Sequence, residues 1–333
     1  MRMLVTALSW FRNIWGIVSL SKYNRTGQDK AVEQTMKSIQ TILIAATLIA
    51  CGKPQKQDGS GATTSGGRTV IQNKGSDTLV NVAQAWAETY KTVDPNVAIA
   101  VTGGGSGTGI SSMINGTVDI ANSSRAMKTK ELEAAKKNGI DPKQNIVGYD
   151  ALAVFLHPSN PINEISIEQI KAIYGEHGTM EKWSDLGVTI EGCPSDEIIR
   201  ISRQNNSGTY AYFKKAVLGK GEYKLGSRDM HGSKDVVDLV ENTPCAIGYS
   251  GLAYANDHIK MPCVKKGADE ACVTPTVPTA ADGSYPIARP LFMYTAGEPT
   301  GANKQYLDWI LSDAGQCIIL DKGYASVRDV TCG

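Results

Sequence analysis

Three turns rich in glycine and hydroxyl residues each stand directly before a stretch with helical spacing. They are Gly75–Leu79, Gly103–Gly109 and Ser207–Thr209, and Arg203 lies four residues before the last of them. The first N–H groups of a helix have no partner inside the helix and lie at the positive end of its dipole, so small oxyanions bind there. Three such turns in one chain predict an anion site assembled from several helix starts.

The residue types in these turns suit a tetrahedral oxyanion. A buried charge without partners costs several kcal/mol, so each oxygen needs hydrogen-bond donors. Glycine lets the backbone come close, Ser and Thr hydroxyls donate or accept, and Arg203 offers a planar, permanently charged fork. Each turn alone also fits an ordinary helix cap or loop, as does Ser123–Arg125. The prediction therefore depends on their combination.

An alternation of short apolar strands with helices positions these turns and predicts an α/β fold. Strands are expected at Val70–Ile71, Val97–Val101, Val118–Ile120, Ala151–Leu156, Ile198–Ile201, Ala246–Tyr249 and Leu291–Tyr294. Apolar residues at helical spacing follow Leu79, Ile110, Phe213, Val236 and Tyr306, and a capping box opens a helix at Ser166. Gly148–Leu156 and Cys245–Ala255 are candidates for carrying the chain between two lobes, which periodicity alone leaves open.

The N-terminal region resembles an export signal instead of a folded domain. Residues 36–50 combine Met36-Lys37 with an apolar run that ends in Leu-Ile-Ala-Cys51, the pattern of a bacterial lipoprotein signal. We expect Cys51 to be acylated and 51–68 to be a flexible tether. Residues 1–35 do not fit a signal, so we expect Met36 to be the true start, with a genuine extension as the alternative. The expected location is the periplasm or the cell surface, anchored by lipid.

Charge argues against a nucleic-acid partner. The chain has 333 residues with 34 Lys/Arg and 33 Asp/Glu. Because residues 1–50 hold six basic and two acidic residues, the remainder carries 28 basic and 31 acidic residues, a net charge of −3. A nucleic-acid surface is strongly basic and clustered. An anion would therefore be held by local dipoles and a placed Arg.

The cysteines of an exported chain predict disulfides. Once Cys51 is acylated, six remain, and sequence alone allows 15 pairings. Cys263–Cys272 and Cys317–Cys332 would close short loops, which leaves Cys193–Cys245. No C-x-x-C occurs and the four His are scattered, so we expect no metal and no cofactor.

The order of motifs resembles the phosphate-binding receptors of bacterial phosphate ABC importers, from about Val70 to the C-terminus. The matching segments are Gly75–Leu79, Gly103–Gly109, Asn115–Ile120 with Ser123–Arg125, Tyr149–Val154 with His157-Pro158, Ser202–Thr209, Gly232–Val237, Pro244–Tyr249 and Tyr285–Pro290. The resemblance implies a type II periplasmic-binding fold, with two α/β lobes joined by two crossing strands and a ligand cleft between them. Lobe I would comprise 69–151 and 247–333, and lobe II 152–246.

The resemblance also implies a phosphate site. The ligand contacts that carry over, together with neighbouring residues of the same turns, are Ser76, Thr78, Leu79 (through its N–H), Ser106, Gly107, Ser124, Arg203, Ser207, Gly208 and Thr209. Some members have an Asp at the position of Ser124, which accepts the proton that phosphate carries and sulfate lacks. Here another acceptor is needed, and Asp150 is the first candidate and Asp77 the second. Cys245 also departs from the family, where Gly usually follows the Pro, and this favours its pairing with Cys193.

We therefore expect an exported, lipid-anchored, monomeric receptor that captures inorganic phosphate and delivers it to an ABC permease. The alternatives are a receptor for another oxyanion such as sulfate, a phosphate sensor or adhesin, and a phosphatase-like enzyme. The enzyme is disfavoured because no Gly-x-Ser-x-Gly surrounds Ser106 and no Walker motif occurs.

Overall fold

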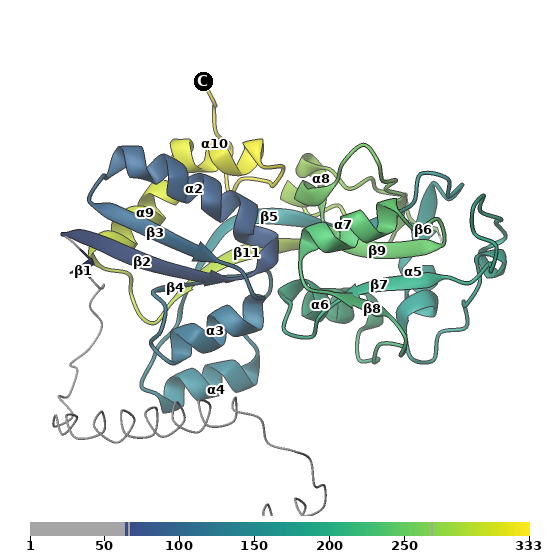
Figure 1. Cartoon of the computed structure of the whole chain (residues 1–333), viewed down its shortest axis with the longest axis horizontal. Coiled ribbons are helices and arrows are strands. Elements are labelled where there is room, and N and C mark those ends of the chain that lie inside the picture. Colours follow the sequence, from purple (N-terminus) through teal and green to yellow (C-terminus); the bar gives the residue numbers. More distant parts are fainter. Residues whose placement is uncertain (1–63, 66, 268) are drawn as a thin grey trace, which may run out of the picture. The chain divides into compact units, whose positions relative to one another are not determined.

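One mixed sheet of nine strands runs through the protein (Figure 1). The computed structural model describes residues 64–65, 67–267 and 269–333, which lie in one compact unit, Ser60–Gly333. The predicted signal and the lipid site Cys51 fall outside the described residues. The strand order is β1-β2-β4-β11-β5-β9-β7-β8, with β3 beside β2. The strands are β1 (Thr64–Ser65), β2 (Arg68–Gly75), β3 (Val97–Thr102), β4 (Ile120–Ser123), β5 (Lys143–Leu156), β7 (Ile199–Arg203), β8 (Arg228–Met230), β9 (Ala246–Gly251) and β11 (Ala288–Thr295).

Strand β5 belongs to both halves of this sheet. Its residues Lys143–Ala151 pair antiparallel with β11, and its residues Leu152–Leu156 pair antiparallel with β9. The chain thus leaves one lobe and enters the other within a single strand. It reaches the first lobe again after β9, where Tyr254 Oη donates to Asp77 O (2.6 Å), and it returns finally through β11, which pairs with β4 and β5. This arrangement confirms the two-lobed α/β fold with crossing strands.

The first lobe packs helices on both faces of its part of the sheet. On β11, Leu291 and Met293 join the core formed with α2, α9 and α10, whereas Phe292 and Tyr294 join the core formed with α3 and α4. This alternation follows from the two-residue period of a strand. Figure 1 shows the two sets of helices on opposite sides. These helices are α2 (Val80–Val93), preceded by the 3₁₀ turn η1 (Asp77–Leu79), α3 (Ser106–Ile114), α4 (Thr129–Lys137), α9 (Gly301–Ile310) and α10 (Asp313–Asp321).

The second lobe repeats this layering with the other half of β5. Leu152, Val154 and Leu156 enter one buried cluster, and Ala153 and Phe155 enter another, which is covered by α7. The elements of this lobe are β6 (Glu164–Ser166), α5 (Ile167–Tyr174), η2 (Trp183–Leu186), α6 (Gly208–Phe213), η3 (Lys214–Leu218, a π-helical turn), α7 (Ser233–Glu241), η4 (Leu252–Tyr254), β10 (Cys263–Lys265) and α8 (Val277–Ala281). The capping box at Ser166 is present: its hydroxyl accepts from Gln169 N–H at the start of α5.

The structure differs from the sequence expectations at several places. The end of the predicted tether, Thr64–Ser65, is strand β1, so the sheet begins earlier than expected. Strand β5 starts at Lys143 instead of near Ala151. The residue-level lobe boundaries stay a prediction. Strand β10 pairs with β6, and Val264 and Ile287 pack in the cluster of Ile170, which favours placing about residues 256–287 with the second lobe.

All three disulfide predictions are confirmed. Cys193 is bonded to Cys245, Cys263 to Cys272, and Cys317 to Cys332. In the part of the chain that the structure describes, no helix combines the length and the apolar character that crossing a bilayer requires.

Candidate functional site

Three serines of the first lobe form a buried hydroxyl cluster. Ser76 follows β2, Ser106 opens α3, and Ser124 follows β4, so three connections at one edge of the sheet supply them. Ser76 Oγ donates to Ser124 Oγ (2.9 Å), and Ser124 N–H donates to Ser106 Oγ (3.1 Å). All three side chains are at most 2% exposed. The predicted turns of this lobe therefore meet at one point.

The start of α6 in the second lobe reaches the same point. Thr209 Oγ1 lies 3.0 Å from Thr78 Oγ1, and both residues are fully buried. Gly208 is required here, because a Cβ at this position would lie 2.2 Å from Ser106 Oγ and 2.5 Å from Ser124 Oγ. The residues of the two lobes thus come together as the sequence predicted.

Asn206 joins the lobes beside this cluster, and Ser207 follows it at the start of α6. The Ser207 hydroxyl accepts from the N–H groups of Thr209 and Tyr210, which leaves its own proton free to donate. Asn206 Nδ2 donates to Gly104 O (3.0 Å), and Gly107 N–H donates to Asn206 O (2.9 Å). Gly107 therefore lies at the meeting point but uses its N–H for the contact between the lobes.

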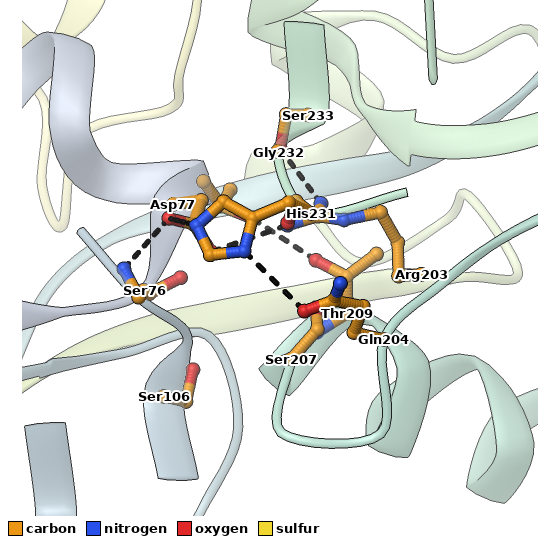
Figure 2. A network of polar contacts seen from close by, with 12 residues as sticks. Ser76, Asp77, Ser106, Arg203, Gln204, Ser207, Thr209, His231, Gly232 and Ser233 are labelled. Carbon is orange, nitrogen blue, oxygen red and sulfur yellow. Dashed lines mark hydrogen bonds and ion pairs between the residues drawn. The ribbon is translucent and has the colours of Figure 1, made fainter. Parts of the chain in front are cut away.

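Arg203 is buried at the end of β7 and faces the first lobe. Its Nη1 donates to Ser233 Oγ (2.9 Å), and its Nη2 donates to His231 O (2.9 Å) and to Asp77 Oδ2 (3.4 Å) (Figure 2). Burial lowers the pKa of Arg203, and the charge of Asp77 opposes this shift. The Nε atom has no hydrogen-bond partner among the described residues. Arg203 therefore brings a buried guanidinium to the place where the lobes meet.

Asp77 is held by both lobes. Its Oδ1 accepts from Gly104 N–H (2.9 Å) and its Oδ2 accepts from Arg203. The largely exposed ring of His231 lies above it, with Nε2 at 3.9 Å from Asp77 Oδ1. Both carboxylate oxygens are therefore engaged within the protein.

Asp150 lies deeper, on β5, and contacts a residue that sequence reasoning missed. Arg289 on β11 donates to Asp150 Oδ2 through Nε (3.0 Å) and Nη2 (2.7 Å), and neither side chain is exposed. Burial raises the pKa of Asp150, opposed by Arg289 and by the Leu252 N–H. Asp150 Oδ1 makes no hydrogen bond of standard geometry with the described residues. Arg289 lies in Tyr285–Pro290, a segment that matches the phosphate-binding receptors, but nothing in that segment alone indicates that Arg289 belongs to the site.

Leu79 is placed at the site but its N–H is engaged. This N–H donates to Ser76 O (3.0 Å) within η1, and the side chain is buried in the core with Trp86. Its role as a ligand contact stays a prediction.

The residue types that bind metals do not point to a metal here. Among the described residues, one group within reach of a single ion is Glu164 with Cys263 and Cys272. Those two sulfurs form a disulfide and are therefore not thiolate ligands. Where the lobes meet, hydroxyl groups and the Arg203 guanidinium lie buried near one another, which suits an oxyanion.

Comparison with known proteins agrees with this geometry. Residues 60–314 match the family described as the PBP superfamily domain. The chain is 34% identical over 282 residues to the phosphate-binding protein PstS of Pseudomonas aeruginosa PAO1, covering 81% of this chain and 85% of that protein. The chain belongs to the PstS family of phosphate-binding proteins. The PstS protein of Bacillus subtilis 168 is 31% identical over 307 residues, covering 88% of this chain and 95% of that protein.

A solved structure extends the PstS comparison. A substrate-binding protein of a phosphate ABC transporter from Clostridium perfringens, determined with bound phosphate, is 29% identical, with a TM-score of 0.69 over 78% of this chain and all of that chain. These relatives of the PstS family are described as binding proteins, which agrees with the expectation of a receptor.

Proposed function

We propose that this protein is a receptor that captures inorganic phosphate and delivers it to an ABC permease. The observation that carries the proposal is the meeting of Ser106, Ser124, Thr78 and Thr209 at one buried point between two lobes, with Arg203 at its edge. Membership of the PstS family supports phosphate as the ligand, because the P. aeruginosa and B. subtilis relatives are named for it.

The ligand set that we propose is the predicted one. Hydroxyls come from Ser76, Thr78, Ser106, Ser124, Ser207 and Thr209, the backbone approaches at Gly107 and Gly208, and Arg203 supplies charge. The Leu79 N–H would join this set only by leaving its bond to Ser76 O. We propose that Asp150, and not Asp77, accepts the proton that phosphate carries. Asp150 keeps one oxygen without a standard hydrogen bond, whereas both oxygens of Asp77 are engaged.

Export, lipid attachment at Cys51 and a monomeric state belong to the same proposal. They are supported by the signal pattern before Cys51 and by the three disulfides, which form and persist in oxidising compartments. The protein would act by binding alone. Ser106 Oγ contacts Ser124, not a histidine that could activate it as a nucleophile.

Titration calorimetry of the purified protein with inorganic phosphate tests the proposal. We expect a dissociation constant in the micromolar range or tighter, about 8 kcal/mol or more, because the site offers many charge-assisted hydrogen bonds. Sulfate at the same concentrations is the matched control and should bind more weakly. No heat and no rise in the thermal midpoint at millimolar phosphate would end this proposal.

A further inference from the structure

Arg289 brings a second guanidinium to the point where the lobes meet, separate from that of Arg203. Besides Asp150, its hydrogen bonds go to Thr209 Oγ1 (Nη1, 3.1 Å), Thr78 Oγ1 (Nη2, 3.3 Å) and Ser124 O (Nη1, 3.4 Å). Each of these three acceptors belongs to a segment that the sequence assigned to the anion site. A guanidinium that served only to neutralise Asp150 would not need them.

The sheet fixes the position of Arg289. It lies directly opposite Asp150 in the antiparallel register of β11 and β5, and the pair is fully buried. Thr209, in contrast, comes from α6 of the second lobe. Arg289 is therefore a fixed part of the sheet that meets hydroxyls from both lobes.

The hydrogen-bond inventory of the two threonines shows what this contact does. A hydroxyl has one proton to donate and two lone pairs to accept. Because Arg289 only donates, the hydroxyl oxygens of Thr78 and Thr209 must accept from it. At 3.0 Å one hydroxyl donates to the other, and the second keeps its proton. An anionic oxygen between them could take both protons.

We propose that Arg289 is a positioning residue of the anion site, which holds the Thr78 and Thr209 hydroxyls as donors. Asp150 keeps the guanidinium in place, so the side chain acts on the ligand through the two threonines. The site then favours an oxygen that carries no proton at this position. The inference rests on the proposed phosphate function.

The test compares phosphate affinity by calorimetry for wild type, Arg289→Lys, Thr78→Val and the double variant. Lysine keeps the charge beside Asp150 but presents a point charge in place of a fork. We expect Arg289→Lys to weaken phosphate binding about tenfold to hundredfold, as expected for one or two lost charge-assisted hydrogen bonds. Arg200→Lys is the control, because Arg200 pairs with Glu181 outside the site (2.9 Å) and should leave the affinity unchanged.

The double variant separates positioning from a purely structural role. If Arg289 acts through the Thr78 hydroxyl, Thr78→Val should cost about tenfold in wild type and much less in the Arg289→Lys background. Additive losses, or an Arg289→Lys affinity within about twofold of wild type, would overturn the inference. Thermal midpoints without phosphate show whether each variant is folded.

A folding defect in Arg289→Lys would still leave the idea testable. Thr78→Val and Thr209→Val keep Arg289, and each should weaken phosphate binding; normal affinity in both would refute the inference. Failure of the proposed function looks different, since wild type itself would then show no phosphate binding.

Discussion

Two Arg–Asp pairs lie where the lobes meet, and they are built in different ways. Arg289 and Asp150 face each other on neighbouring strands, 2.7 Å apart, with neither side chain exposed. Arg203 and Asp77 come from different lobes, lie 3.4 Å apart, and Asp77 is 11% exposed. The register of the sheet makes the first pair, whereas the second requires the lobes to meet.

This difference assigns the pairs different tasks. A pair made by strand register is present whether or not a ligand is bound, so it can organise the site in advance. A pair made between lobes forms only when the lobes are in contact, as they are here, and it adds to the free energy of that contact. Organisation of the site within the sheet and contact between the lobes are thus supported by separate charges.

The two pairs should differ most in their contribution to the free energy of unfolding. Asp150→Leu leaves Arg289 buried and unpaired, and we expect it to lower the free energy of unfolding by about 3–5 kcal/mol. Asp77→Leu should cost less, about 1–3 kcal/mol: Gly104 N–H loses its acceptor, but Arg203 keeps Ser233 and the His231 carbonyl. Urea unfolding without phosphate measures both values.

A compensating variant sharpens this test. Adding Arg289→Met to Asp150→Leu removes the orphaned charge and should recover most of the lost stability. Equal costs for Asp150→Leu and Asp77→Leu would mean that the two pairs do not differ in the way that their burial indicates.

Asp150 and Asp77 should also differ, by a smaller amount, in their effect on selectivity for phosphate over sulfate. If Asp150 Oδ1 accepts the proton of phosphate, Asp150→Asn should lower the phosphate-to-sulfate affinity ratio about tenfold to hundredfold. Asp77→Asn should weaken both anions alike, because Asp77 joins the two lobes and has both oxygens engaged in the protein. Competition calorimetry with the two anions measures the ratio. An unchanged ratio in Asp150→Asn would remove Asp150 as the acceptor.

The two pairs also mark how far the sequence can predict this site. Arg203 was predicted because it lies four residues before Ser207, and a single strand-to-helix connection keeps the two together. Arg289 was not, because its partners lie 80, 139 and 211 residues away in the chain. Only the pairing of β11 with β5 brings Arg289 to them. Spacing in the sequence predicts which residues of one connection lie together, but it does not predict which residues face each other across two paired strands.

The fold shows the same difference between local pattern and strand pairing. The strands with continuous apolar runs were predicted, as were the disulfides that close short loops. The first half of β5, with its polar Lys143–Asn145, has no strand pattern and forms because β11 pairs with it. The Leu79 N–H was expected to be free, but a 3₁₀ turn uses it, and turn type cannot be read from Gly75–Leu79 alone.

A third ion pair, Arg125–Glu131, should contribute least to stability, and its contribution should depend on pH. Arg125 binds both oxygens of Glu131 (2.7 Å each) at the start of α4. Burial alone would raise the pKa of Glu131, but the hydrogen bonds from Arg125 and from Lys128 N–H outweigh it and lower the pKa.

A carboxyl whose pKa is lower in the folded than in the unfolded state adds stability above the unfolded-state pKa. This stability is lost as the pH falls through the folded-state pKa. Because Glu131 is partly exposed, we expect less than about 1 kcal/mol. Urea unfolding from pH 7 to pH 3 should show a shallower acid-side decline in Glu131→Gln than in wild type, and identical slopes would show that the pair adds nothing.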